Sequence, residues 1–76
     1  MIRLSSRQAV LYVMDTFKCS KYAVAKKVGA APVSVSQWLT GTKMCKEYAE
    51  EFKMQFDIEV VDAYNSSMGV PKRDSA

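Results

Sequence analysis

The hydrophobic residues of this chain recur at helical spacing in several short blocks. In the first block they fall at i, i+3, i+4 and i+7, namely Val10, Val13, Met14 and Phe17. This spacing predicts an amphipathic helix from Arg7 to about Phe17. Either Ser5 or Ser6 can cap its start, because a serine oxygen accepts a hydrogen bond from an unpaired N–H of the first turn. Ile2 and Leu4 precede this helix, and either pack on the core or form a short strand.

The next two helices are marked mainly by their end signals. Ser20 is a typical N-cap for a helix from Lys21 to Val28, and Gly29 suits the left-handed residue that ends a helix. Pro32 fits the first position of a third helix that reaches Leu39 or Thr40. Two helices of this length, joined by a tight glycine turn, bury little surface if they lie antiparallel. We therefore expect them to cross steeply, as a helix-turn-helix over residues 21–40.

A fourth helix is predicted from Met44 to Phe56. Its apolar positions share one face: Cys45, Tyr48, Ala49, Phe52 and Phe56. The segment from Ile58 to Val61 fits either a short strand or the opening of a fifth helix. Residues 66–76 contain glycine, proline and many polar residues, which predicts a flexible tail. The predicted fold class is all-α: one compact domain of four or five helices over residues 1–65, with a possible short strand near either end.

The chain of 76 residues has room for one domain, whose small core needs help from a partner or a cross-link. It has no histidine, and Cys19 and Cys45 lie too far apart for any common zinc-binding spacing, so we expect neither metal nor cofactor. No charged-then-apolar leader is recognisable, and no apolar stretch is long enough to span a membrane. These features predict a reduced, cytoplasmic protein that gains stability by dimerisation.

Charge is distributed unevenly along the chain. Residues 1–46 carry eight basic side chains and one acid, Asp15, whereas residues 47–76 carry three basic and seven acidic groups. The first part therefore has a net charge of +7 and the second a net charge of −4. A strongly basic N-terminal part suits a polyanionic partner such as DNA.

The predicted third helix has two chemically different faces. One face is apolar, with Val35, Trp38 and Leu39, and the opposite face is a stripe of short uncharged side chains, namely Val33, Ser36, Gln37 and Thr40. Such side chains can approach base edges in the major groove, where a glutamine amide pairs with adenine and a valine contacts the thymine methyl group. Lys21 and Lys43 flank this stripe in sequence and suit contacts to phosphate. The apolar face is expected to be structural.

Four spaced residues, Ala25, Gly29, Val35 and Trp38, complete this pattern within the runs 22–29 and 35–41. The pattern resembles the Cro/CI-type (XRE-like) helix-turn-helix regulators of bacteriophages and prophages, over about residues 7–56. The resemblance implies a DNA-binding fold whose base-contacting positions are Pro32, Val33, Ser36, Gln37 and Thr40. The phosphate contacts expected with them are Lys18, Lys21, Ser34 and Lys43. Two departures are that Pro32 stands where the family often has a base-contacting glutamine, and that Ala31 is a poor cap.

The resemblance predicts a transcriptional regulator, most simply a Cro-like repressor that binds a palindromic operator as a homodimer in the bacterial cytoplasm. The dimer contact is expected at the large apolar residues of segment 52–64: Phe56, Ile58, Val60, Val61 and Tyr64. The alternative is an antitoxin-type protein that uses the same fold to hold a toxin partner. An enzyme is not expected, because the chain has no histidine and no glycine-rich phosphate loop.

Overall fold

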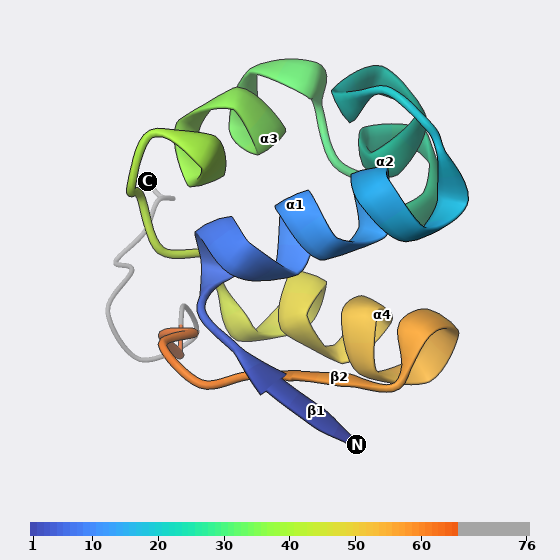
Figure 1. Ribbon diagram of the computed structural model, residues 1–76. Coiled ribbons are helices and arrows are strands. Elements are labelled where there is room, and N and C mark those ends of the chain that lie inside the picture. Colours follow the sequence, from blue (N-terminus) through green and yellow to red (C-terminus); the bar gives the residue numbers. More distant parts are fainter. Residues whose placement is uncertain (66–76) are drawn as a thin grey trace.

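The computed structural model of the chain describes residues 1–65, and the predicted tail at 66–76 lies outside these residues. The described part contains four helices and two short strands in the order β1 (Ile2–Leu4), α1 (Ser6–Phe17), α2 (Lys21–Val28), α3 (Pro32–Leu39), α4 (Lys46–Phe56) and β2 (Ile58–Val60). Helix α1 crosses the middle of the molecule (Figure 1), with α2 and α3 on one side and α4 with the two strands on the other. The fold is thus mostly helical rather than purely α.

Local capping signals fix the first two helices. Ser5 is the N-cap of α1, and its Oγ accepts from the N–H of Gln8 at 3.2 Å while the Gln8 side chain accepts from the N–H of Ser5 at 3.4 Å. This reciprocal pair is a capping box, which satisfies two otherwise unpaired amides. Ser20 caps α2 through the N–H of Ala23, and Gly29 ends that helix with φ 76°. The predicted bounds of α2 agree with the structure.

The segment after α4 is a strand and not a fifth helix. β2 pairs with β1 in parallel, with Ile2 opposite Ile58 and Leu4 opposite Val60. Ile58 and Val60 face inward and are buried, whereas Glu59 points outward and forms an ion pair with Arg3 at 3.5 Å. The alternation of buried and exposed positions is typical of a strand with one face on a core.

Residues 44 and 45 do not belong to the fourth helix, contrary to the prediction. Met44 lies beside Tyr64, whose N–H donates to the Met44 carbonyl at 3.1 Å, and the N–H of Lys46 donates to the Tyr64 carbonyl at 2.7 Å. Since these backbone groups pair with an extended neighbour, α4 begins at Lys46. The sequence pattern missed this because both residues are buried, as core helix residues would be.

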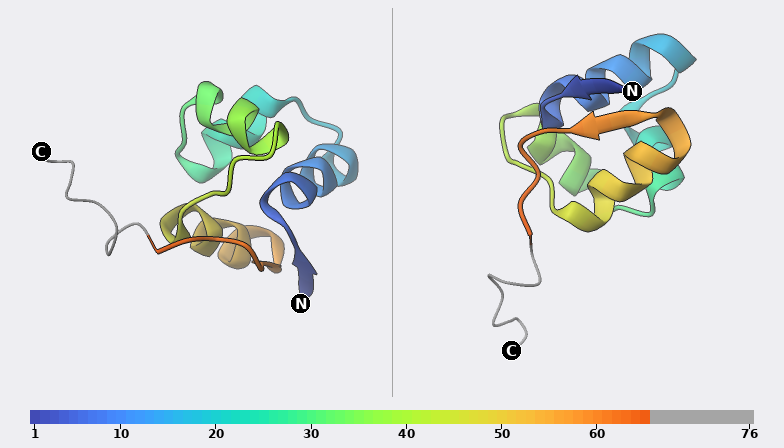
Figure 2. Two further views of the ribbon diagram at one scale, coloured as in Figure 1. Left: turned by 90° about the vertical axis from the view of Figure 1, so that its left-hand side faces the viewer. Right: turned by 90° about the horizontal axis from the view of Figure 1, so that it is seen from below.

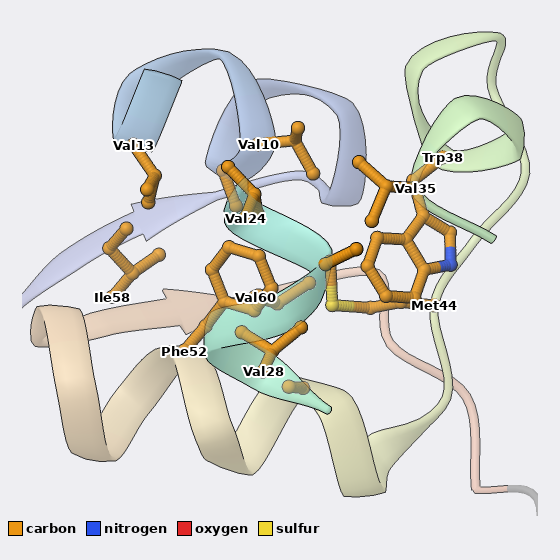
Figure 3. Close-up of a cluster of buried hydrophobic side chains, with 13 residues drawn as sticks. Val10, Val13, Val24, Val28, Val35, Trp38, Met44, Phe52, Ile58 and Val60 are labelled. Carbon is orange, nitrogen blue, oxygen red and sulfur yellow. The ribbon is translucent and has the colours of Figure 1, made fainter. Parts of the chain in front are cut away.

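A single hydrophobic cluster joins all four helices and β2. Figure 3 shows Val35 and Trp38 of α3 pointing into the same interior as Val10 of α1, Val24 of α2 and Phe52 of α4. The buried members of the cluster are Ala9, Val10, Val13, Val24, Ala25, Val28, Val35, Trp38, Met44, Ala49, Phe52, Ile58 and Val60. Phe17, predicted to be on the inner stripe of α1, is instead half exposed and lies against Phe56, with ring centroids 5.4 Å apart.

One buried polar side chain ties three segments together. The Ser6 hydroxyl donates to Asp62 Oδ1 at 2.7 Å and accepts from the N–H of Met44 at 2.9 Å, and the Ser6 N–H also donates to Asp62 at 2.8 Å. Ser6 is 1% exposed. A buried hydroxyl is normally hydrogen-bonded, and Ser6 finds its partners in two other segments. These bonds therefore hold the start of α1 against the loop before α4 and the segment after β2.

Candidate nucleic-acid interface

The inner face of α3 holds this helix firmly on the domain. Val35 is fully buried and Trp38 is 3% exposed. The Trp38 ring contacts two rings of α4, with centroids 5.2 Å from Tyr48 and 6.3 Å from Phe52. Leu39 is half-buried at the edge of the same face. The predicted structural role of Val35 and Trp38 agrees with this packing, which fixes the direction in which the outer face points.

The outer face of α3 is open to solvent. Val33 is 61% exposed, and Pro32, Gln37 and Thr40 are also exposed. Ser34 and Ser36 are half-buried, so their hydroxyls are less accessible than the sequence stripe alone suggests. Val33, Ser36, Gln37 and Thr40 lie on one face at helical spacing and form what we call the α3 outer face. None of these side chains is charged, which leaves hydrogen bonding and apolar contact as the chemistry of this surface.

Hydrogen bonds at the end of α3 limit what Thr40 can offer. The backbone carbonyl of Gln37 accepts from the N–H of Thr40 at 3.1 Å, from the N–H of Thr42 at 2.9 Å and from the Thr40 hydroxyl at 2.8 Å. The hydroxyl proton of Thr40 is therefore directed back at the helix. Its oxygen lone pairs remain available, so an outward contact of Thr40 would accept a hydrogen bond.

The start of α3 has a different character. Ala31 is its N-cap and makes no side-chain capping bond, and Pro32 follows as the first helical residue. The proline needs no partner for an N–H that it lacks, which lessens the cost of the missing cap. The expectation that Ala31 is a poor cap therefore agrees with the structure.

The three lysines predicted to contact phosphate have different surroundings in the structure. Lys21 stands in the first turn of α2, with Nζ 5.6 Å from the centre of the Tyr22 ring, and Lys43 is exposed in the loop after α3. Neither lysine forms an ion pair with another residue in 1–65. Lys18, in contrast, lies 3.9 Å from Asp15 Oδ1, and both side chains are largely exposed. Lys18 and Lys43 are exposed and Lys21 is half-buried, and the exposed ion pair of Lys18 is too weak to withdraw its charge from an incoming anion.

The structure adds a cation that the sequence pattern did not indicate. The Nε–H of Arg7 donates to the backbone carbonyl of Leu39 at 3.1 Å. Arg7 belongs to the first turn of α1 and is exposed. The only sequence signal for it was its contribution to the basic N-terminal part, because the contact joins residues far apart in the chain.

The charge imbalance of the sequence is also an imbalance in space. Acidic side chains gather on α4 and its continuation, at Glu47, Glu50, Glu51, Asp57 and Glu59, whereas α1, α2 and α3 contain one acid, Asp15. Figure 2 shows α4 and the strands along the lower side of the molecule in the left-hand view, away from α3. An anion that approaches α2 and α3 therefore meets mainly basic and neutral side chains.

Some residues predicted at a dimer contact are buried in the structure, and others are exposed. Ile58 and Val60 are 0% and 8% exposed because they fill the core of their own chain, which withdraws them from any surface. Phe56 is half-buried between Phe17 and Phe52. Val61 and Tyr64 are about half exposed, at 52% and 50%, and remain free to contact a partner. The apparent surplus of apolar residues in this segment is thus largely used within the monomer.

Away from α3, the described part of the chain contains a groove of mixed chemical character. A groove of about 360 Å³ between α4 and the two strands is lined by a mixture of basic, acidic and small apolar residues. Residues 1–65 hold no group of three or more metal-ligating side chains, and no helix among them is long and apolar enough to cross a membrane. Comparison of the chain with protein-family models, curated proteins and solved structures found no match.

Proposed function

We propose that this chain is a sequence-specific double-stranded DNA-binding regulator in which α2 and α3 act as a helix-turn-helix. The observation that carries this proposal is the division of α3. Val35 and Trp38 hold its inner face in the core, while its outer face carries uncharged side chains that are mostly exposed. A helix that is rigidly mounted and free of bulky charged groups can enter the major groove and approach base edges.

The α3 outer face supplies base contacts of distinct kinds. Gln37 can pair its amide with the N6 and N7 edge of adenine, and Val33 can contact a thymine methyl group. Thr40 accepts a hydrogen bond from an exocyclic amino group, since its own proton is directed to the Gln37 carbonyl. Ser36 and Pro32 are assigned to the edge of this contact, because Ser36 is half-buried and Pro32 carries no polar group.

Phosphate contacts would hold the helix in register. Lys21 stands at the N-terminus of α2, where the backbone N–H groups and the helix dipole also favour an anion. Lys43 provides a second contact beyond the end of α3, and Lys18 and Ser34 provide further ones. Such contacts contribute affinity without sequence preference.

The proposed regulator acts as a homodimer in the bacterial cytoplasm and represses transcription by occupying a palindromic operator. A two-fold dimer would place two α3 helices about 34 Å apart, one turn of DNA. Val61 and Tyr64 are the exposed apolar residues of the C-terminal segment that would contribute to the contact.

The test begins with selection of a preferred site from random double-stranded DNA, followed by affinity measurements on that site and on random DNA. Gln37→Ala should weaken binding to the preferred site by about 1–3 kcal/mol and barely affect random DNA. Lys21→Ala should weaken both and lower the slope of log affinity against log salt by about one unit. Lys53→Ala is the matched control, because it removes one exposed positive charge from α4 and should leave both affinities unchanged.

The same experiment can contradict the proposal. If the unmodified protein selects no sequence, or if Gln37→Ala leaves the preference unchanged, α3 does not read bases. If none of the substitutions changes DNA binding, the outer face of α3 serves another partner, and the antitoxin-type alternative gains support.

A further inference from the structure

Arg7 occupies a position that α1 itself does not favour. It lies in the first turn of α1, where the positive end of the helix dipole repels a cation, and this turn contains no acidic residue. Its charge is not offset by any ion pair within the described residues. A basic side chain at this point therefore has no evident benefit to the helix that carries it.

The benefit lies at the far end of α3. The Arg7 Nε–H donates to the carbonyl of Leu39, the last residue of α3, at 3.1 Å. A cation at a helix C-terminus pairs with exposed carbonyls and with the negative end of the dipole. This bond links the start of α1 to the end of α3, next to Thr40 of the α3 outer face.

Only one of the five N–H donors of the Arg7 guanidinium is used by this bond. The four others belong to the two Nη groups of a side chain that is exposed. The backbone of Lys43 runs through the same corner, because the next residue, Met44, donates its N–H to the Ser6 hydroxyl beside Arg7. The backbone of Lys43 thus lies close to the start of α1 and follows the end of α3, where the helix dipole alone would repel a phosphate.

We propose that Arg7 clamps α3 to the DNA backbone: its Nε–H holds the Leu39 carbonyl while its Nη groups bind a phosphate oxygen. A planar guanidinium can make both contacts at once with fixed geometry, because its donors lie on three separate nitrogens in one rigid plane, whereas the donors of an ammonium group rotate about a single nitrogen. This inference rests on the proposed DNA-binding function and adds a positioning residue to it.

Two substitutions separate the parts of the clamp. Arg7→Ala removes both contacts, so the slope of log affinity against log salt should fall by about 0.9, with roughly fivefold weaker binding to random DNA at 0.15 M salt. Arg7→Lys keeps the charge and should keep the slope, but its three rotatable N–H donors lack the fixed geometry that orients carbonyl and phosphate relative to each other. Preference for the selected site over random DNA should therefore fall about two- to fivefold with Arg7→Lys. Lys53→Ala is again the matched loss of one charge, and circular dichroism melts report whether each variant stays folded.

The outcomes discriminate between a clamp, a structural arginine and a failed premise. An unchanged salt slope in folded Arg7→Ala overturns the phosphate contact, and an unchanged preference in Arg7→Lys overturns the positioning role. If Lys21→Ala lowers the slope and Arg7→Ala does not, the clamp is wrong while the DNA-binding proposal stands. If the unmodified protein binds no DNA, both are wrong.

Discussion

Replacing Trp38 by alanine is expected to remove a large part of the stability of this domain. Truncation of a buried tryptophan usually costs about 3–5 kcal/mol, from lost burial and from the cavity left behind. Trp38 is 3% exposed and contacts the rings of both Tyr48 and Phe52, and each such aromatic pair adds about 0.5–1.5 kcal/mol beyond burial. The upper part of the range is therefore expected.

This loss is large compared with the total stability of so small a chain. At about 0.05–0.15 kcal/mol per residue, the 76 residues give roughly 4–11 kcal/mol of unfolding free energy. Trp38→Ala should thus remove a large fraction of this free energy and lower the urea concentration at the midpoint of unfolding. Trp38→Phe retains one ring against α4 and should cost about 1–2 kcal/mol.

The measurement is urea unfolding followed by far-UV circular dichroism, because the substitution removes the single tryptophan that would report by fluorescence. Gln37→Ala, at the neighbouring exposed position, is the control and should change the unfolding free energy by less than about 0.5 kcal/mol. A Trp38→Ala variant within about 1 kcal/mol of the unmodified protein would refute the reasoning. If that variant stayed folded and lost only DNA binding, the assignment of the two faces of α3 would be reversed.

Three further predictions follow from other parts of the structure. Ser6→Ala leaves the buried Met44 N–H without its acceptor and should cost about 1–3 kcal/mol in urea unfolding, whereas Ser36→Ala should cost less than about 0.5 kcal/mol. Gly29→Ala should cost about 1–2 kcal/mol. The cost arises from backbone strain at φ 76° and not from a clash, since the added Cβ meets no atom within 4 Å; an unchanged melting temperature would show that the turn relaxes. Sedimentation should detect a dimer that Val61→Asp weakens, and a monomer both at high concentration and on DNA would exclude the proposed dimer.

The local elements of this protein follow from its sequence alone. A cap needs one side chain and one amide a few residues away, so Ser20 and Gly29 determine the ends of α2 without reference to the rest of the chain. The burial of Val35 and Trp38 and the exposure of Val33 and Gln37 likewise follow from helical periodicity. The α3 outer face was therefore predictable, including its uncharged character.

The contacts between distant segments were decided by the tertiary structure. Three residues such as Ile58–Val60 are too few to distinguish a strand from a turn of helix, and their pairing with Ile2–Leu4 depends on a partner at the other end of the chain. That pairing buries Ile58 and Val60 within the monomer, which the apolar composition of the segment could not reveal.

The same limit applies to single side chains. Sequence periodicity left Ser5 and Ser6 equivalent, yet Ser5 caps α1 and Ser6 is buried in a network with Asp62 and Met44. Arg7 gained its place beside the end of α3 only when α1 packed against that helix. Sequence determines which residues can cap, cover or present a helix, because these properties act over a few residues. Packing decides which distant backbone groups those residues meet, because such contacts exist only once the core has closed.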